Sequence, residues 1–297
     1  YLNGKENGEG IEYNKDGKLL FEGEFKNDEK WNGKVKDYNS EGKLIFEGEY
    51  LNGKIWNGKG KEYNSDYNSR TKLEFEGEYL NGEKIGKGKE YHYDNGNLLF
   101  EGEFLNGKKS GKGKEYKYDG KLIFEGEYLN GKRNGEGIEY YNNGEKKFEG
   151  KYLNGKRNGL GKEYYDNGKV KFEGEFLNEK RHKMGKEYGY NGKLLFEGEY
   201  LYDRKWNGKG YDGLTNIVYE LIDGNGKVKE YNKDYKLIFE GEYLNGEKWN
   251  GIGKEYSNYG QLILEVEYLN GEKTGKGKKY SYRGKLEFEG EYLNGER

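Results

Sequence analysis

Hydrophobic and polar positions alternate along this chain in short runs that return at a regular interval. The segment at 121–128 reads KLIFEGEY, in which the rings and the glycine share one parity and the two glutamates the other. Alternation with a period of two places such sets on opposite faces of a β-strand. Asn130-Gly131 follows, and both residues tolerate the positive φ of a tight turn. The pattern therefore predicts a β-strand that ends in a hairpin.

A second, glycine-rich strand follows each of these turns. It reads GEGIEY at 135–140 and GKGKEY in most other places, and a second turn such as Asn143-Gly144 leads into the next aromatic strand. Glycines and β-formers at a period of two do not make the apolar stripe of a helix. Turns at both ends of every hairpin predict a continuous antiparallel meander.

The aromatic strand recurs eleven times, with its leading residue at 21, 46, 75, 100, 124, 148, 172, 196, 239, 264 and 288. The leading residue is Phe in every copy except Leu264. Such repetition predicts an all-β fold, an elongated, single-layer, twisted array of antiparallel β-hairpins with about one hairpin per 24 residues. We expect one continuous array over 1–297, with about twelve hairpins and an irregular, shortened hairpin near 207–228.

The glycines of the return strand have a mechanical explanation. Opposite charges pair well across neighbouring strands, and aromatic rings pack well over bare glycine backbone. We expect the lysines in 59–61 to face the glutamates in 47–49, with the glycines of 58–60 beneath the rings of 46–50.

All four tryptophans occupy one slot, immediately before an Asn-Gly in the first turn, in repeats longer than 24 residues: Trp31, Trp56, Trp206 and Trp249. Each is an added residue that a loop or bulge must absorb without shifting the strand register. Four indoles along one edge are the candidate partner-binding residues. The other interpretation is that each indole folds back to cover the edge of the sheet.

The repeat resembles the MORN (membrane occupation and recognition nexus) repeat. The segment FEGEYLNGKRNGEG at 124–137 has its aromatic-Glu-Gly-Glu-Tyr start, its Asn-Gly-Lys turn and its Gly-x-Gly return. It is also similar to the MORN-like variant of bacterial antitoxin-type proteins, in which Lys-Glu-Tyr-Tyr follows the glycines. The resemblance implies an elongated β array used in scaffolding, protein contact and association with membranes. The segment LNEKRHKM at 177–184 departs from the pattern.

Composition narrows the possible partners. The 53 Lys and Arg residues balance 55 Asp and Glu residues, for a net charge of −2. Nucleic acid is therefore not an expected partner, because its binding needs an excess of cations. A chain with only 31% hydrophobic residues would normally suggest disorder. Here 32 Tyr, 13 Phe and 4 Trp supply the apolar area to bury.

Candidate chemistry is sparse. The chain has no cysteine and two histidines, His92 and His182, which we expect at the surface. No Ser-His-acid set or Gly-x-x-x-x-Gly-Lys-Ser/Thr loop occurs. We therefore expect no enzymatic activity, no cofactor and no metal.

The leading hypothesis is a non-enzymatic repeat scaffold that binds protein partners and also associates with itself. The alternative is a peripheral module for a membrane surface, binding phospholipid, and a carbohydrate- or cell-surface-binding module comes third. The cytoplasm is the favoured location, with the cell surface or extracellular space open if an N-terminal signal is missing. Both ends lie inside the repeat phrase, as expected of a fragment of a longer protein or of an array that continues into another copy.

Overall fold

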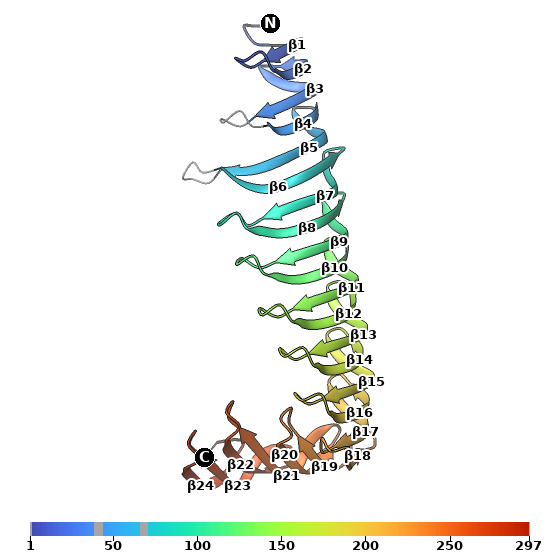
Figure 1. Cartoon of the computed structure of the whole chain (residues 1–297), viewed down its shortest axis with the longest axis vertical. Helices are drawn as coiled ribbons and strands as arrows, with labels where there is room; N and C mark the ends of the chain where they lie inside the picture. The colour runs from blue at the N-terminus through green and yellow to red at the C-terminus, as the bar shows by residue number, and fades with distance from the viewer. Residues whose placement is uncertain (1, 39–43, 66–70, 297) are drawn as a thin grey trace. The chain divides into compact units, whose positions relative to one another are not determined.

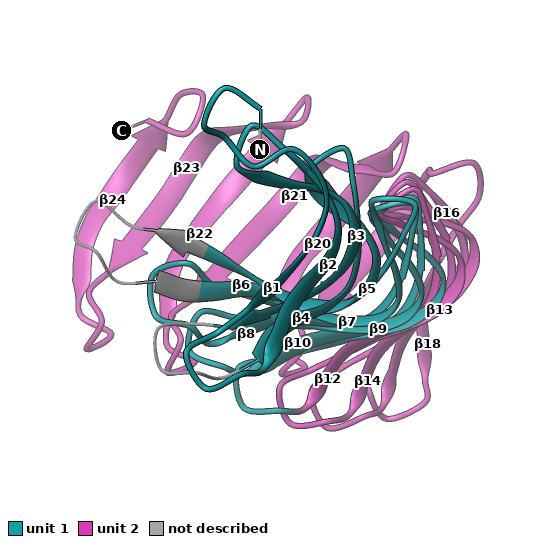
Figure 2. Cartoon of the chain, turned by 90° about the horizontal axis from the view of Figure 1, so that it is seen from above, with its two compact units in different colours: residues 1–144 teal, residues 145–297 magenta. Residues whose placement is uncertain are grey.

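The computed structural model describes residues 2–38, 44–65 and 71–296. These residues form strands and turns, without a helix, in two compact units, residues 1–144 and 145–297 (Figure 1, Figure 2). The predicted all-β fold built from antiparallel hairpins is thus confirmed. Within the described ranges, no helix is long and apolar enough to cross a membrane.

Unit 1 is a meander in which each strand pairs antiparallel with the next, so that its hairpins lie side by side (Figure 1). Its strands are β1 (Gly8–Tyr13), β2 (Leu19–Lys26), β3 (Glu29–Tyr38), β4 (Leu44–Leu51), β5 (Lys54–Ser65), β6 (Thr71–Leu80), β7 (Glu83–Tyr91), β8 (Leu98–Leu105), β9 (Lys108–Tyr116), β10 (Leu122–Leu129) and β11 (Lys132–Tyr140).

Unit 2 contains two runs of paired strands. The first comprises β12 (Lys146–Leu153), β13 (Lys156–Tyr164), β14 (Val170–Leu177), β15 (Lys180–Tyr188), β16 (Leu194–Leu201), β17 (Arg204–Tyr211) and β18 (Ile217–Leu221). The second comprises β19 (Gly226–Tyr231), β20 (Leu237–Leu244), β21 (Glu247–Tyr256), β22 (Leu262–Leu269), β23 (Glu272–Tyr280) and β24 (Leu286–Tyr292). The short β18 pairs with β17, but β19 begins a separate sheet. The predicted meander is therefore interrupted at the shortened hairpin.

A row of glycines crosses the strands of unit 1. Glycines of successive strands lie directly opposite one another at Gly60, Gly77, Gly88, Gly102, Gly113, Gly126 and Gly137. The row is required by close packing: a Cβ added at Gly88 would lie 2.7 Å from Cζ of Phe75. Side chains larger than hydrogen would displace the rings.

The expected pairing around β4 and β5 is correct at two of four positions. Lys59 lies opposite Glu47, and Gly60 lies under the Phe46 ring. Lys61 instead faces Glu76 of the following strand. Gly58 packs against the backbone of β4 rather than under a ring. In the observed register Glu49 lies opposite Asn57, next to the bulge between Glu49 and Tyr50.

The aromatic face forms the core. The leading phenylalanines are fully buried in most repeats: Phe21, Phe75, Phe100, Phe124, Phe148, Phe172, Phe196 and Phe239. Phe100 makes edge-to-face contacts with Phe104 and with Tyr128 of the next repeat, at centroid distances of 5.5 and 5.2 Å. A cation covers each of these eight rings, as the Arg133 guanidinium does 4.0 Å from the Phe124 centroid. A single sheet thus buries its rings beneath its own basic side chains.

Candidate functional site

The four tryptophans are bulge residues. In β3, Lys30 and Asn32 pair with Phe25 and Glu24, and Trp31 between them has no partner on β2. Trp56, Trp206 and Trp249 are skipped in the same way. The predicted insertion into one turn slot is therefore accommodated as a β-bulge.

Each indole packs over the turn of the following hairpin. The Trp56 ring lies 3.8 Å from the position that a Cβ would take if Gly82 had one. The Gly82 N–H donates to the Trp56 carbonyl at 2.8 Å. Trp31 and Trp249 meet Gly53 and Gly271 in the same way. All four tryptophans are half-buried. The structure thus spreads the predicted site residues along both units, each against its own neighbouring turn.

A groove of about 1100 Å³ crosses β4–β11 on the charged face of unit 1. We call it the ladder groove. The glycine row forms its floor, and each strand from β5 to β10 adds one charged residue on either side of its glycine. Lys87 and Lys89 of β7 are followed by Glu101 and Glu103 of β8. The walls of the groove therefore alternate in sign from strand to strand.

Ion pairs link neighbouring strands along these walls. Lys59 Nζ lies 2.8 Å from Glu78, and Lys61 Nζ lies 3.1 Å from Glu76. The Tyr91 hydroxyl also donates to Glu76 at 2.7 Å. Such exposed pairs add about 0–1 kcal/mol each to stability. The walls of the groove thus carry a pattern of alternating charge and little net charge.

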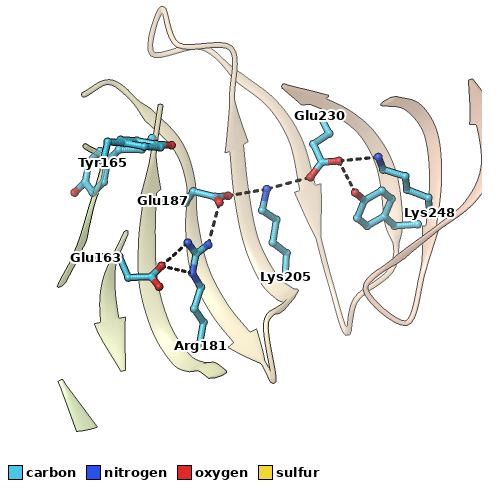
Figure 3. A network of polar contacts seen from close by, with 9 residues as sticks. Glu163, Tyr165, Arg181, Glu187, Lys205, Glu230 and Lys248 are labelled. Atoms are coloured by element: carbon cyan, nitrogen blue, oxygen red, sulfur yellow. Dashed lines mark hydrogen bonds and ion pairs between the residues drawn. The ribbon is translucent and has the colours of Figure 1, made fainter. Parts of the chain in front are cut away.

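On the aromatic face of unit 2, the cations that cover the rings form a continuous chain of ion pairs with glutamates (Figure 3). Arg181 of β15 lies 4.3 Å from the Phe172 centroid. Its guanidinium donates to Glu163 of β13 at 2.8 Å and to Glu187 at 2.9 Å. The chain thus connects two strands that are not neighbours.

Lys205 of β17 extends this chain into the second sheet of unit 2. Its Nζ lies 3.0 Å from Glu187 and 3.3 Å from Glu230 of β19 (Figure 3). Glu230 also accepts a hydrogen bond from the Tyr243 hydroxyl at 2.8 Å and lies 3.5 Å from Lys248. We call the residues Glu163, Arg181, Glu187, Lys205, Glu230 and Lys248 the corner network, because they join the two sheets of unit 2.

The pKa values in the corner network reflect two opposing effects, burial of the charged groups and attraction by their oppositely charged neighbours. Burial alone would raise the pKa of Glu187, but Lys205 and Arg181 outweigh it and lower the pKa to about 2. Burial alone would lower the pKa of Lys205, but Glu187 and other neighbours raise it well above its usual value. Both groups are therefore charged at neutral pH. The network acts as a structural clamp with every charge compensated.

A cavity of about 500 Å³ lies beside the corner network, where the two sheets of unit 2 meet. Arg204 on its wall pairs with Glu247 at 2.6 Å, and Lys233 pairs with Asp234 at 3.1 Å. Its charges are thus balanced within the protein. Among the described residues, no three His, Cys, Asp or Glu side chains gather to hold a metal ion.

Both histidines are half-buried rather than fully exposed at the surface. The His92 ring packs 5.6 Å from that of Tyr118, and the His182 ring packs 4.9 Å from that of Tyr202. His92 Nε2 and His182 Nδ1 are buried. The two rings lie in separate units.

Sequence comparison assigns the repeat. The MORN repeat model matches residues 75–97, 100–121 and 124–146, and the MORN repeat variant model matches residues 6–27, 31–52 and 157–178. The chain is a MORN repeat protein. MORN repeats are generally modules for interaction with proteins or membranes, and the family is generally non-enzymatic. No curated protein matches this MORN repeat chain.

Similarity to solved structures is low. The chain matches the Tc holotoxin pore of Photorhabdus luminescens with 11% identity and a TM-score of 0.21, over 97% of this chain and 16% of that chain. It matches TcdB2-TccC3-TEV with 11% identity and a TM-score of 0.19, over 96% of this chain and 14% of that chain. The MORN array thus spans about a sixth or less of the length of these chains.

Proposed function

We propose that this MORN repeat protein is a non-enzymatic scaffold that binds protein partners along its charged face. The ladder groove is the observation that carries the proposal. It offers a long, solvent-open track whose glycine floor lets a partner approach the backbone closely. Specific recognition of a protein segment uses such patterned, mutually complementary charges.

In this proposal the tryptophans contact the partner along one edge of the array. Trp31, Trp56, Trp206 and Trp249 are half-buried, so part of each ring remains available to a partner. Rigid aromatic side chains of this kind dominate the binding energy of many protein interfaces. Association of the chain with itself is a further part of the proposal, and light scattering at increasing concentration tests it.

A membrane surface is the second candidate. The residue after each aromatic strand's tyrosine or phenylalanine is an exposed leucine in several hairpins, among them Leu80, Leu105, Leu129 and Leu153. Leucines near lysines at a turn edge favour contact with the interfacial layer of a bilayer. The balanced net charge argues for the protein partner first, because anionic lipid surfaces select basic patches.

The test reverses the charge of two lysines in the ladder groove. The tagged chain and its Lys87→Glu/Lys112→Glu variant are purified from the producing cell, and the co-purifying proteins are quantified by mass spectrometry. A matched control, Lys15→Glu/Lys121→Glu, reverses two lysines in turns outside the groove. We expect a near-stoichiometric partner to be retained by the control and lost by the groove variant. Equal recovery with both variants, or binding of the chain to anionic vesicles without any protein partner, would contradict the proposal.

A further inference from the structure

The two sides of the ladder groove differ in how their charges are satisfied. One side lies toward the second turns, which join each glycine-rich strand to the next aromatic strand, and the glutamates of β6, β8 and β10 on this side are half-buried. Each accepts a hydrogen bond from a tyrosine hydroxyl, as Glu101 does from Tyr116 at 2.6 Å. On the same side, Lys114 lies 3.7 Å from Glu125. The protein itself therefore occupies the charged groups of this side.

The other side of the groove, nearer the turns within the hairpins, is different over β7–β11. Each of these strands places one exposed charged residue there. Among the described residues, none of the five has an ion-pair or hydrogen-bond partner, although Lys87 lies opposite Glu103 in the ladder. We call the five residues the open row: Lys87, Glu103, Lys112, Glu127 and Glu136.

The tryptophan hairpins show what the open row lacks. In each of them the asparagine after the tryptophan donates its side-chain amide to the glutamate of this side, as Asn57 does to Glu49 at 2.9 Å. In β9, Ser110 takes the place of that asparagine beside Glu103 and makes no hydrogen bond with it. Glu103 is therefore left to solvent or to a partner.

The open row has a defined charge order. From β7 to β11 its signs are positive, negative, positive, negative and negative. Neighbouring strands lie about 4.8 Å apart, so opposite charges alternate at about this distance along the row. Attraction between such exposed neighbours is weak in water, so exchanging it for contact with a partner costs little.

An α-helix is the regular structure whose side chains match this spacing. Residues three and four apart lie on one face of a helix, about 4.5 and 6 Å apart along its axis. Five such residues span about 21 Å, against about 19 Å for the five strands of the open row, a difference that long charged side chains accommodate. A β-strand repeats a face about every 6.8 Å and a polyproline II helix about every 9.3 Å, so neither presents both signs at the strand spacing. The glycine floor lets the helix lie close to the sheet.

We propose that the open row binds an α-helix of a partner protein with acidic, basic, acidic, basic and basic residues along one face, at alternating spacings of three and four residues. The acidic residues pair with the two lysines of the open row, and the basic residues pair with its three glutamates. The described residues of this chain contain no helix, so a second copy of them does not supply the occupant. The proposal rests on the scaffold function and names the chemistry of its partner.

The test uses a designed helical peptide as the probe. The capped, fluorescently labelled peptide EAAKAQAEAAKAQAKAQ carries these charges in this order, with alanine for close approach to the glycine floor. Binding to the full chain is measured by fluorescence anisotropy at about 0.15 M salt, where exposed charges act only over short distances. The peptide KAAKAQAKAAEAQAEAQ has the same composition with like charges grouped, and a third peptide replaces two alanines of the first with proline. We expect saturable binding of the first peptide, at least fivefold weaker binding of the grouped peptide and no binding of the proline peptide.

Variants of the chain test an individual contact. Lys112→Glu is expected to weaken binding of the first peptide at least fivefold, and a peptide whose central glutamate is changed to lysine is expected to prefer this variant to the unaltered chain. Lys114→Glu makes the same change of net charge on the other side of Gly113. It is the matched control, and we expect it to alter binding of either peptide less than twofold. Equal binding of the grouped or the proline peptide, or equal effects of the two variants, would overturn the proposal.

The result is separable from that of the scaffold function. If the first peptide does not bind but a natural partner is lost from the Lys87→Glu/Lys112→Glu variant, the helix proposal fails and the scaffold function stands. If the first peptide binds with the expected selectivity but no protein co-purifies with the chain, recognition of the helix is supported and the scaffold function fails.

Discussion

The Trp206 indole lies 2.8 Å from the position of a Cβ on Gly224, and the Gly224 N–H donates to the Trp206 carbonyl at 2.8 Å. One bulge residue thus fixes the next turn through both its ring and its backbone. Gly224 in turn accepts from the N–H of Gly246, the turn glycine of the following hairpin. The contact therefore passes along the turn edge of unit 2 across the break between its sheets.

Replacing Trp206 with alanine is expected to loosen this edge. The change removes a half-buried ring, so we expect a loss of about 1–3 kcal/mol, less than for a fully buried tryptophan. Hydrogen exchange of the Gly224 and Gly246 amides, read by NMR, measures the local effect. Tyr259→Ala, at a side chain that is 92% exposed, is the control. Equal exchange in both variants would show that the indole does not hold the turn.

Removing Lys205 is expected to be severe. Lys205→Met leaves Glu187 and Glu230, whose side chains are 21% and 15% exposed, without their shared cation. Breaking such a largely buried pair costs about 3–5 kcal/mol in comparable cases. Denaturant unfolding measures the loss. Lys59→Met is the control, because the Lys59 side chain is 78% exposed and its ion pair is screened by solvent. A loss below about 1 kcal/mol for Lys205→Met would show that the corner network is not a clamp.

The lowered pKa of Glu187 predicts that the free energy of unfolding falls at acid pH. Its pKa falls from 4.5 to about 2 in the folded protein. A carboxyl with a lowered folded pKa stabilises fully above its unfolded pKa and loses that contribution as the pH falls toward the folded pKa. The expected contribution is about 3 kcal/mol, lost between about pH 5 and 2. The difference in unfolding free energy between the wild type and Glu187→Gln should shrink over this range, and a difference independent of pH would refute the assignment.

Lys183→Gly is expected to stabilise the chain. Glycine adopts the observed φ of 55° without the Cβ strain of lysine, which is worth about 1 kcal/mol. The reverse test is Gly159→Ala at a φ of 101°, which should destabilise. Thermal unfolding measures both. If Lys183→Gly lowers the melting temperature, the ion pair of Lys183 with Glu175 contributes more than the strain removes.

The glycine row gives a steric prediction. Gly88→Ala places a methyl group where Cζ of Phe75 is 2.7 Å away, so the ring must move and we expect a loss of about 1–3 kcal/mol. Lys89→Ala, in the same strand with its side chain 46% exposed, should change the unfolding free energy by less than about 0.5 kcal/mol. Similar losses for the two variants would argue against the packing of ring on glycine.

Sequence alone predicts the hairpins and the tryptophan bulges, because both follow from local spacing. The corner network is not visible there, because Glu187, Lys205 and Glu230 belong to three different strands and resemble ordinary ladder residues. One signal does exist: in Gly-x-Gly-Lys-Glu-Tyr the glutamate shares the parity of the glycines, which places it on the aromatic face. The sequence marks the shortened hairpin near 207–228, but not that strand pairing stops between β18 and β19, since Asp223-Gly224 resembles the other turns. Tyr235, which packs against Gly189 and Gly213, becomes apparent only in three dimensions.

The most direct test of the scaffold function is site-specific photo-crosslinking in the producing cell. A photo-reactive amino acid replaces Lys112 in the ladder groove or, as control, Tyr93 in an exposed turn of the same unit. We predict one protein of defined mass crosslinked from position 112 and absent from position 93. Crosslinks to lipid alone from position 112, or the same proteins from both positions, would contradict the account.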